Sequence, residues 1–398
     1  MNPHRTSQHI IPFSQALDIA SYYGFRPIQE FISEQRSLQK KGSKRTVTAP
    51  RGDATSLDTN RSAVLRSFLE EGLQDHKSLP LHVVHASLMP APGIRKSKQP
   101  YLCLDIIDAH KSIAEAVLIQ TACSILRNAR IPNIYVEINS VGDQDAYACF
   151  IRECASYYRK RISDLPTVGR ELLKKDIFQL LSHNHEKCKE IAEDAPKPIN
   201  FLSEPHRMHF MEVLEYLESM GIPYRINESM SYCRNCYSRT IFEIKSGNGV
   251  TTDSTEDTTL ARGGRFDELS RAFGLRKNIP GVGITLFADK FSTTVLPKQK
   301  RAHAPKVFLI QLGFEAKLLS LKVLETLRTA RIPVHQMLAK DRLSAQISLA
   351  ERLKIPFTMI IGQREAMDDT VILRDMDTRM QQVIPVRDLC SVIRAIIQ

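Results

Sequence analysis

The chain lacks any long hydrophobic run. No stretch of its 398 residues approaches the ~18–20 continuous apolar residues that a membrane-spanning helix needs. The opening residues MNPHRTSQHIIPFSQ carry one basic residue and no apolar run of signal-peptide length. Eight cysteines are scattered through the sequence without a framework spacing, which favours reduced thiols over disulfides. We therefore expect a cytoplasmic protein without a membrane segment.

Several enzyme signatures are also missing. The sequence has no Walker-type phosphate loop, no GxSxG nucleophile elbow, no zinc-protease helix pattern and no long repeat. Hydrophobic residues make up 42% and charged residues 25% of the chain, which excludes collagen-like, coiled-coil and wholly disordered classes. At about 100–200 residues per domain, this length predicts two or three domains.

Acidic residues are the scarcer charge. There are 55 Lys and Arg against 44 Asp and Glu, a net charge of +11, and the sequence pI is about 9.2. This excess favours a polyanionic partner such as nucleic acid, or a substrate that carries phosphates. A basic protein without such a partner would have the same composition, so charge alone leaves both interpretations open.

Periodicity and composition divide the chain into two units. The first covers residues 1–295 and contains a polar segment, about 164–206, that we interpret as a small helical insertion. A basic, proline-containing linker precedes the second unit, residues 303–398, in which strands alternate with helices. That alternation predicts a small α/β domain with a mixed sheet, and residues 301–398 carry a net charge of +5.

Local patterns near the N-terminus give more detailed expectations. Residues 12–34 read as helix with a break at Gly24, and residues 81–89 read as a strand that ends at Pro90. A basic stretch follows, and a second strand is expected over residues 101–107.

Seven stretches, taken in order, resemble bacterial histidyl-tRNA synthetases. They are ASYYGFRPI at 20–28, TAPRGDATS at 48–56, VEINSVGDQDA at 136–146, SRTIFEI at 238–244, LARGGRFDEL at 260–269, PGVGITLFADKF at 280–291, and the three strand and helix runs within 321–386. The resemblance is collinear and covers nearly the whole chain. It implies an α/β protein of the class II synthetase type. An α+β catalytic-type domain, with an antiparallel sheet flanked by helices, would be followed by an α/β anticodon-binding-type domain. It also implies a homodimer, tRNA and histidine as ligands, and ATP with Mg²⁺ if the chain is active.

The resemblance assigns ligand-binding roles to several residues. Arg51, Asp53 and Thr55 fall in the segment that binds the amino acid's ammonium group in that family, although a surface turn can have the same composition. Tyr237 matches the last tyrosine of the family's Arg-Gly-Leu-Asp-Tyr-Tyr run. The turn near the ATP pocket is matched by Gly263, Gly264 and Arg265. Glycine allows close approach to a ligand or a positive φ, and ordinary strand packing explains a glycine pair equally well.

The phosphate side departs from the family pattern. Amino-acid activation brings a carboxylate to the α-phosphate of ATP, which requires guanidinium groups and Mg²⁺ around the triphosphate. The family's second motif, roughly Phe-Arg-His-Glu, is matched by a segment in which Met89 is followed by Pro90, and no arginine occurs there before Arg95. Tyr232 replaces the arginine at the α-phosphate, and Lys290 replaces the third-motif arginine. Lysine lacks the two-pronged contact of arginine.

One residue is a candidate substitute for a missing arginine. Arg234 lies two residues after Tyr232, on the same face if the segment is a strand. Because Met89, Tyr232 and Lys290 depart from the family pattern, we assign no catalytic residue. We expect the chain to be deficient in adenylation.

The CRNC sequence at Cys233–Cys236 raises the question of a metal. A zinc site needs two further ligands, for which His183, His185 and Cys188 are the candidates. Because nothing in the sequence brings them near, we expect packed thiols and no metal.

The sequence favours a histidyl-tRNA synthetase-like pseudoenzyme that binds tRNA or another RNA, or acts in regulation. One alternative is an active histidine–tRNA ligase in which Arg95, Arg234 and Lys290 supply the missing cations. A second is the histidine-sensing regulatory subunit of ATP phosphoribosyltransferase, a related family that usually lacks the anticodon-binding domain.

Overall fold

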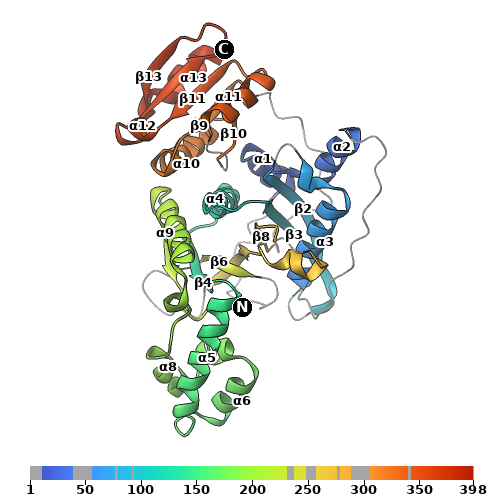
Figure 1. The fold of residues 1–398 in the computed structure, drawn as a ribbon, viewed down its shortest axis with the longest axis vertical. Helices are drawn as coiled ribbons and strands as arrows, with labels where there is room; N and C mark the ends of the chain where they lie inside the picture. The colour runs from blue at the N-terminus through green and yellow to red at the C-terminus, as the bar shows by residue number, and fades with distance from the viewer. Residues whose placement is uncertain are drawn as a thin grey trace, which may run out of the picture.

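The structure is a computed structural model. It describes residues 11–38, 56–76, 79–91, 94–230, 237–247, 257–275, 278–287, 305–338 and 342–397. Two β-sheets organise the described chain, and helices pack against both (Figure 1). No helix in these ranges is long and apolar enough to span a bilayer.

The larger sheet has eight strands in the order β1-β2-β3-β8-β7-β6-β4-β5. The inner pairs are antiparallel, whereas the outer pairs β1–β2 and β4–β5 are parallel. The strands are β1 Arg26–Pro27, β2 Leu81–Ala91, β3 Ile94–Ile107, β4 Ile134–Ser140, β5 Tyr224–Ile226, β6 Ser238–Ser246, β7 Thr258–Arg265 and β8 Gly281–Leu286. This is the antiparallel sheet with flanking helices that the resemblance predicted.

One face of this sheet is apolar. Leu104, Ile284 and Phe242 come from three strands and belong to one buried cluster with residues of the covering helices. Those helices are α1 Phe13–Tyr22, α4 Ile113–Asn128 and α9 Glu204–Ser219. Helix α4 is buried along nearly its whole length, because the sheet covers one side and the C-terminal unit packs on the other (Figure 1).

The opposite face is covered at its two ends. Helices α2 and α3 pack over the β1–β2 end with the 3₁₀ helices η1 and η3. A helical insertion packs beyond β4 and β6, where Val141 and Ile241 join its core. The elements are α2 Ile28–Leu38, α3 Ser56–Glu70, η1 Leu73–Asp75, η3 Leu269–Phe273, α5 Gln144–Lys160, α6 Thr167–Lys175, α7 Ile177–Leu181, α8 Glu186–Glu193 and η2 Pro198–Phe201. The expected helices within residues 164–206 are therefore confirmed.

The smaller sheet has five strands in the order β10-β9-β11-β12-β13, parallel over the first three and antiparallel over the rest. The elements are β9 Val307–Gln311, α10 Phe314–Thr329, β10 Val334–Gln336, α11 Leu343–Arg352, β11 Phe357–Ile361, α12 Gln363–Met367, β12 Thr370–Asp375, β13 Gln381–Pro385, η4 Val386–Asp388 and α13 Leu389–Ile397. The predicted mixed sheet is confirmed.

The two sheet units are joined by buried contacts. Glu325 of α10 accepts a hydrogen bond from the Tyr23 hydroxyl, and the Gln336 amide donates to the Tyr23 carbonyl at 3.1 Å. The Gln120 amide of α4 donates to the Leu321 carbonyl at 3.0 Å. One hydrophobic cluster runs from the large sheet through α4 into the C-terminal unit.

Two local expectations were wrong. Strand β2 continues through Pro90 to Ala91, and β3 begins at Ile94, so the basic stretch is part of a long hairpin. Beyond Val84 the described partner of β2 is β3 alone, and proline is tolerated on a strand whose other edge is free. The second difference is a two-residue strand, β1, between helices α1 and α2, where we had expected only a break at Gly24.

Candidate functional site

The face of the large sheet opposite α4 is called the open face here. Its centre is built by strands β2, β3, β8 and β7. Asp105 pairs in register with Gly283, and Gly283 pairs with Gly264. Because side chains alternate along a strand, cross-strand partners share a face. The carboxylate of Asp105 therefore lies above two glycines on the face opposite α4.

Arg61 of helix α3 reaches into this centre. Its Nε lies 3.3 Å from Asp105 Oδ1, and both side chains are buried, with 4% and 1% exposure. Arg61 also donates to the Tyr237 hydroxyl, and its guanidinium lies 5.3 Å from the centroid of that ring. A Cβ on Gly283 would stand 1.9 Å from Asp105 Oδ1 and 2.6 Å from Arg61 Nε. Gly283 is thus required by the ion pair above it.

His85 and Cys103 complete the centre on the β2 side. They are direct cross-strand partners, and His85 Nδ1 lies 3.5 Å from Asp105 Oδ2. Burial raises the pKa of Asp105 above its usual range and outweighs the opposing effect of Arg61 and His85. Burial disfavours the charged form of His85, yet Cys103 and Asp105 raise its pKa overall.

The other half of the open face holds two more acids. Glu137 of β4 is fully buried and accepts from Arg225 Nε at 2.8 Å, Asn227 Nδ2 at 2.7 Å and Lys245 Nζ at 3.0 Å. Hydrogen bonds and charge from these groups outweigh burial and lower the pKa of Glu137. Across the sheet, Glu243 accepts from Arg262 Nε at 2.7 Å and Lys245 Nζ at 3.4 Å.

These contacts share one property. The open face carries cations from α3, β5, β6 and β7, and each has a carboxylate of the same face within ion-pair distance. They are Arg61, Arg225, Lys245 and Arg262. Each of these four cations therefore already has a carboxylate partner on the same face, although Glu137 and Glu243 share three of them.

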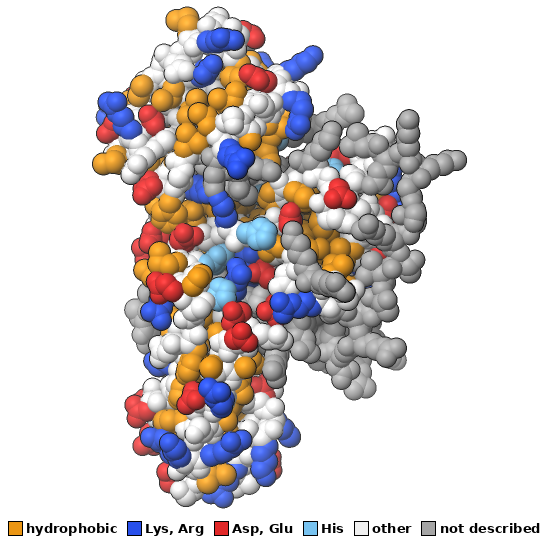
Figure 2. All heavy atoms as spheres, viewed as in Figure 1, with side chains coloured by type: hydrophobic (Ala, Val, Ile, Leu, Met, Phe, Trp, Pro, Cys, Tyr) orange, Lys and Arg blue, Asp and Glu red, His pale blue; other side chains and the backbone are white. Residues whose placement is uncertain are grey.

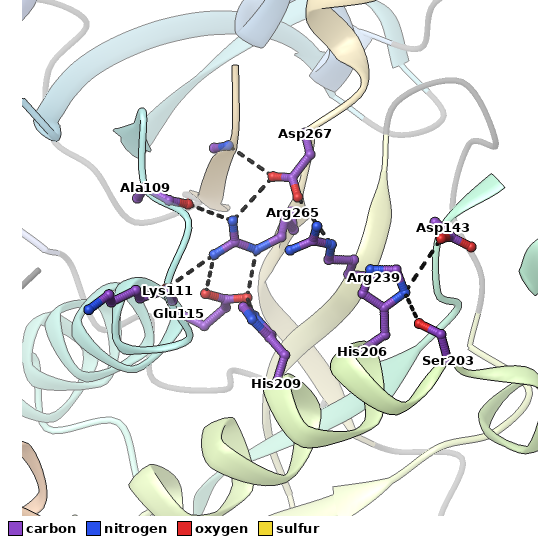
Figure 3. A network of polar contacts seen from close by, with 11 residues as sticks. Ala109, Lys111, Glu115, Asp143, Ser203, His206, His209, Arg239, Arg265 and Asp267 are labelled. Atoms are coloured by element: carbon purple, nitrogen blue, oxygen red, sulfur yellow. Dashed lines mark hydrogen bonds and ion pairs between the residues drawn. The ribbon is translucent and has the colours of Figure 1, made fainter. Parts of the chain in front are cut away.

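Arg265 lies on the opposite side and differs from its expected role. Its side chain is fully buried, and all five N–H groups are directed at protein acceptors (Figure 3). Nε and Nη2 bind the two Glu115 oxygens at 2.8 and 2.6 Å, Nη1 binds the Ala109 carbonyl at 2.6 Å and Asp267 at 3.2 Å, and Nη2 also binds the Lys111 carbonyl at 3.3 Å. In this structure the guanidinium has no N–H left for a ligand, and it holds β7 against α4.

The same network reaches the surface through two histidines of α9. His209 Nε2 lies 2.6 Å from Glu115 Oε1, and His206 Nδ1 lies 3.6 Å from Asp143 and 3.0 Å from Ser203 (Figure 3). Burial, followed by the charge of Arg239, lowers the pKa of His206. Figure 2 shows histidine side chains gathered at the middle of this view, between charged side chains of both signs.

The glycine pair is explained by packing. A Cβ on Gly263 would stand 2.5 Å from the Phe242 ring, and one on Gly264 would stand 2.7 Å from the Tyr237 ring. Neither glycine has a positive φ. The two residues alternate between the faces and let an aromatic ring pack on each.

Most of the other predicted site residues lie outside the described residues. These are Arg51, Asp53, Thr55, Tyr232, Arg234 and Lys290, together with Cys233 and Cys236. Met89 lies within β2, directly before Pro90, and pairs with Gln99. The roles that the resemblance gives to these residues remain predictions.

Of the candidate zinc ligands, His183, His185 and Cys188 lie among the described residues. Within the described ranges no group of three or more His, Cys, Asp and Glu side chains could hold a metal ion. Cys188 is buried in the core of the insertion, and His183 Nδ1 accepts from the backbone N–H of His185 at 3.1 Å.

Sequence reasoning missed the acids of the open face. Asp105 stands in YLCLDII and Glu137 in IYVEIN, each the one charged residue of an otherwise largely apolar strand. A lone carboxylate in such a strand costs free energy unless it is paired, so each was a signal for a buried cation partner. Arg61 gave no signal, because an arginine on a helix is usually solvated.

Comparisons with known proteins match this architecture. An anticodon binding domain model matches residues 306–396. Histidine–tRNA ligase of Desulforudis audaxviator is 28% identical over 386 residues, which are 92% of this chain and 89% of that protein. The enzyme of the same name from Latilactobacillus sakei is 25% identical over 388 residues, 95% of this chain and 86% of that protein. The chain belongs to the histidyl-tRNA synthetase family. The predicted family is confirmed.

A solved structure of the family also aligns with the chain. Apo histidyl-tRNA synthetase of S. aureus has a TM-score of 0.46 and 18% identity, over 98% of this chain and 99% of that chain.

Proposed function

We propose that this member of the histidyl-tRNA synthetase family is deficient in aminoacyl-adenylate formation and acts by binding RNA. The observation that carries the proposal is that the described arginines of the open face are already engaged by carboxylates. Arg61, Arg225 and Arg262 each pair with a carboxylate of the same face. A guanidinium already paired with a carboxylate stabilises a developing phosphate charge less than a free one does.

The expected consequence for catalysis is large. Adenylation places negative charge on the α-phosphate, and removal of a single preorganised donor costs roughly 10²–10³ in rate. The predicted replacements at Tyr232 and Lys290 would remove two more. ATP and Mg²⁺ would be required only if activity remains.

RNA is the partner that the C-terminal unit favours. The anticodon binding domain model matches residues 306–396, and residues 301–398 carry a net charge of +5. We propose tRNA or another RNA as the ligand of a cytoplasmic homodimer, with histidine or another small molecule as a ligand of the open face. The same match disfavours the regulatory-subunit alternative, because that family usually lacks this domain.

An active histidine–tRNA ligase is the second candidate. The relatives that match over most of the chain are named histidine–tRNA ligase, and Arg95, Arg234 and Lys290 remain candidates to supply the cations.

ATP–pyrophosphate exchange separates the two candidates. We expect the purified chain with ATP, Mg²⁺ and histidine to give no exchange above background, while an active histidyl-tRNA synthetase serves as the positive control. Exchange at ordinary synthetase rates would refute the proposed deficiency and establish the ligase.

RNA binding is tested separately, by gel-shift titration against total tRNA. Since each neutralised phosphate releases counterions, the affinity should fall steeply between low and moderate salt. If no complex forms at low salt, the RNA-binding part of the proposal is wrong. Sedimentation equilibrium should give about twice the chain mass of 45.1 kDa, and a clean monomer at micromolar concentration would contradict the dimer.

A further inference from the structure

A groove of about 460 Å³ lies where the N-terminal helices meet the C-terminal unit. One wall comes from α1, β1 and α2, with His82 of β2 at its base, and the other comes from β10 and α11. The groove forms only because the two units dock, since the Gln336 amide and His82 Nδ1 both reach the Tyr23 carbonyl, at 3.1 and 3.2 Å. Its volume is in the range of small-molecule sites, about 300–1,000 Å³.

The base of the groove offers a hydrogen-bond acceptor. His82 Nδ1 lies 3.2 Å from a carbonyl oxygen, which can only accept, so Nδ1 carries the proton and Nε2 has a bare lone pair. His82 lines the groove, and among the described residues only its Nδ1 has a hydrogen-bond partner. Burial lowers the pKa of His82 to about 4, against a smaller opposing effect of the Tyr23 carbonyl. The ring therefore stays a neutral acceptor at physiological pH.

A second imidazole lines the same groove. His335 of β10 is half-buried and packs on Phe308, with 5.1 Å between ring centroids. Burial, with a contribution from Arg26, lowers its pKa to about 4 as well. The groove thus presents two neutral heteroaromatic rings beside Leu349 of α11 and Leu353, which directly follows α11 and is 44% exposed.

The rim includes a cation that has no carboxylate partner among the described residues. Arg26 is engaged by Glu34 at 2.6 Å and lies over the Phe31 ring at 4.2 Å. Arg352, at the end of α11, is exposed and forms no ion pair with any described residue. A planar guanidinium at the mouth of a partly apolar groove suits a phosphate group.

We propose that this groove binds a nucleotide whose base presents an exocyclic amine. The amine donates to His82 Nε2, the base packs between His335 and Leu353, and the phosphate binds Arg352. Stacking together with hydrogen bonding to a base edge is the usual way in which proteins hold an unpaired base. The source is either a free nucleotide or one unit of a single-stranded RNA. The site lies apart from the open face, and the proposal does not depend on the loss of adenylation.

The test uses the full chain and isothermal titration with AMP, CMP, UMP and a short single-stranded oligoribonucleotide. AMP and CMP should bind at least tenfold more tightly than UMP, because uracil has a carbonyl where the amine would donate. His82→Asn keeps a donor toward the Tyr23 carbonyl and removes the Nε2 acceptor, whereas Arg352→Ala removes the cation. Each should weaken binding of AMP at least tenfold. Arg364→Ala is the control, because that exposed arginine lies on α12 and does not line the groove.

The outcomes distinguish a free nucleotide from a unit of RNA, and binding in the groove from binding elsewhere. Binding of AMP that both variants weaken identifies a site for the free nucleotide. Binding of the oligonucleotide alone, weakened by both variants, identifies one unit of RNA. Binding that both variants leave unchanged lies elsewhere, for instance on the open face, and overturns the proposal, as does the absence of saturable binding of every probe. Failure here leaves pyrophosphate exchange and the tRNA gel shift unaffected, so the proposals are judged separately.

Discussion

The buried pair of Glu115 and Arg265 gives the strongest stability prediction. Both side chains are fully buried, and the two partners share two hydrogen bonds, at 2.8 and 2.6 Å. Removing one partner of such a pair leaves an uncompensated charge and costs about 3–5 kcal/mol of unfolding free energy. We expect Arg265→Met and Glu115→Leu each to fall within that range.

The remaining partners set the order of the two variants. In Arg265→Met, Glu115 keeps its hydrogen bond with His209 at 2.6 Å. In Glu115→Leu, Arg265 keeps only Asp267 at 3.2 Å among its carboxylates. Glu115→Leu should therefore be the more destabilising change. The double variant should recover most of the loss, because replacing both members of a buried pair with apolar residues is often neutral.

Urea unfolding of the four proteins measures this double-mutant cycle. Arg152→Ala is the control, since Arg152 is 72% exposed and its neighbour Glu153 is 51% exposed, and we expect no measurable change. The reasoning is refuted if either single variant loses less than about 1 kcal/mol of unfolding free energy. It is also refuted if the loss in the double variant equals the sum of the two single losses.

The same pair predicts an acid limit to stability. Burial opposes ionisation of Glu115, but Arg265 and His209 outweigh it and hold its pKa well below the usual range. A carboxyl group whose pKa is lower in the folded state stabilises the protein fully above its unfolded pKa, about 4.3. That stabilisation is lost as the pH falls towards the folded value. The wild-type advantage over Glu115→Leu should therefore be constant from pH 7 to about 5 and shrink below about pH 4.

Two further predictions use neighbouring or matched residues. Tyr23→Phe removes the hydroxyl that donates to Glu325 across the two units and should cost about 1.5–3 kcal/mol in urea unfolding. Tyr22→Phe removes a buried hydroxyl that has no hydrogen-bond partner among the described residues, so it should be neutral or stabilising, and an equal cost for both would contradict the interdomain role. Gly264→Ala places a Cβ 2.7 Å from an aromatic ring and 3.0 Å from a backbone carbonyl, which should cost about 1–3 kcal/mol. Gly362→Ala should cost less, because there only the end of a glutamate side chain, at 2.8 Å, must move. A lower melting temperature for Gly362→Ala than for Gly264→Ala would contradict the packing argument.

The fold could be predicted further than the site. Alternation of apolar residues located the strands of the C-terminal unit and most of the large sheet, because both sheets bury at least one face. The hairpin through Pro90 was missed because strand pairing can extend where the sequence offers no apolar alternation, over IRKSKQ. The two-residue strand β1 was missed because its pairing with Val83 and Val84 is set by tertiary packing.

The site residues depend on partners that are distant in the sequence. Arg265 was expected at a ligand because it matches the glycine turn of the family pattern, but the Glu115 that binds it lies 150 positions earlier. The Arg61–Asp105 pair likewise joins a helix to a strand that the sequence separates by a long hairpin. A resemblance assigns the position of a residue in a family pattern, whereas its partners decide whether it is free to meet a ligand.

This distinction bears on what the open face can accept. A buried Asp105 without Arg61 would attract a cationic group, such as the ammonium of an amino acid. With Arg61 at 3.3 Å and both side chains buried, an incoming ammonium must displace the guanidinium into a site of equal burial or leave it unpaired, which costs several kcal/mol. The same contact that stabilises the empty face therefore opposes the binding of a cationic ligand at Asp105. A neutral ligand that hydrogen-bonds to Tyr237 or His85 meets no such penalty, since it leaves the ion pair in place.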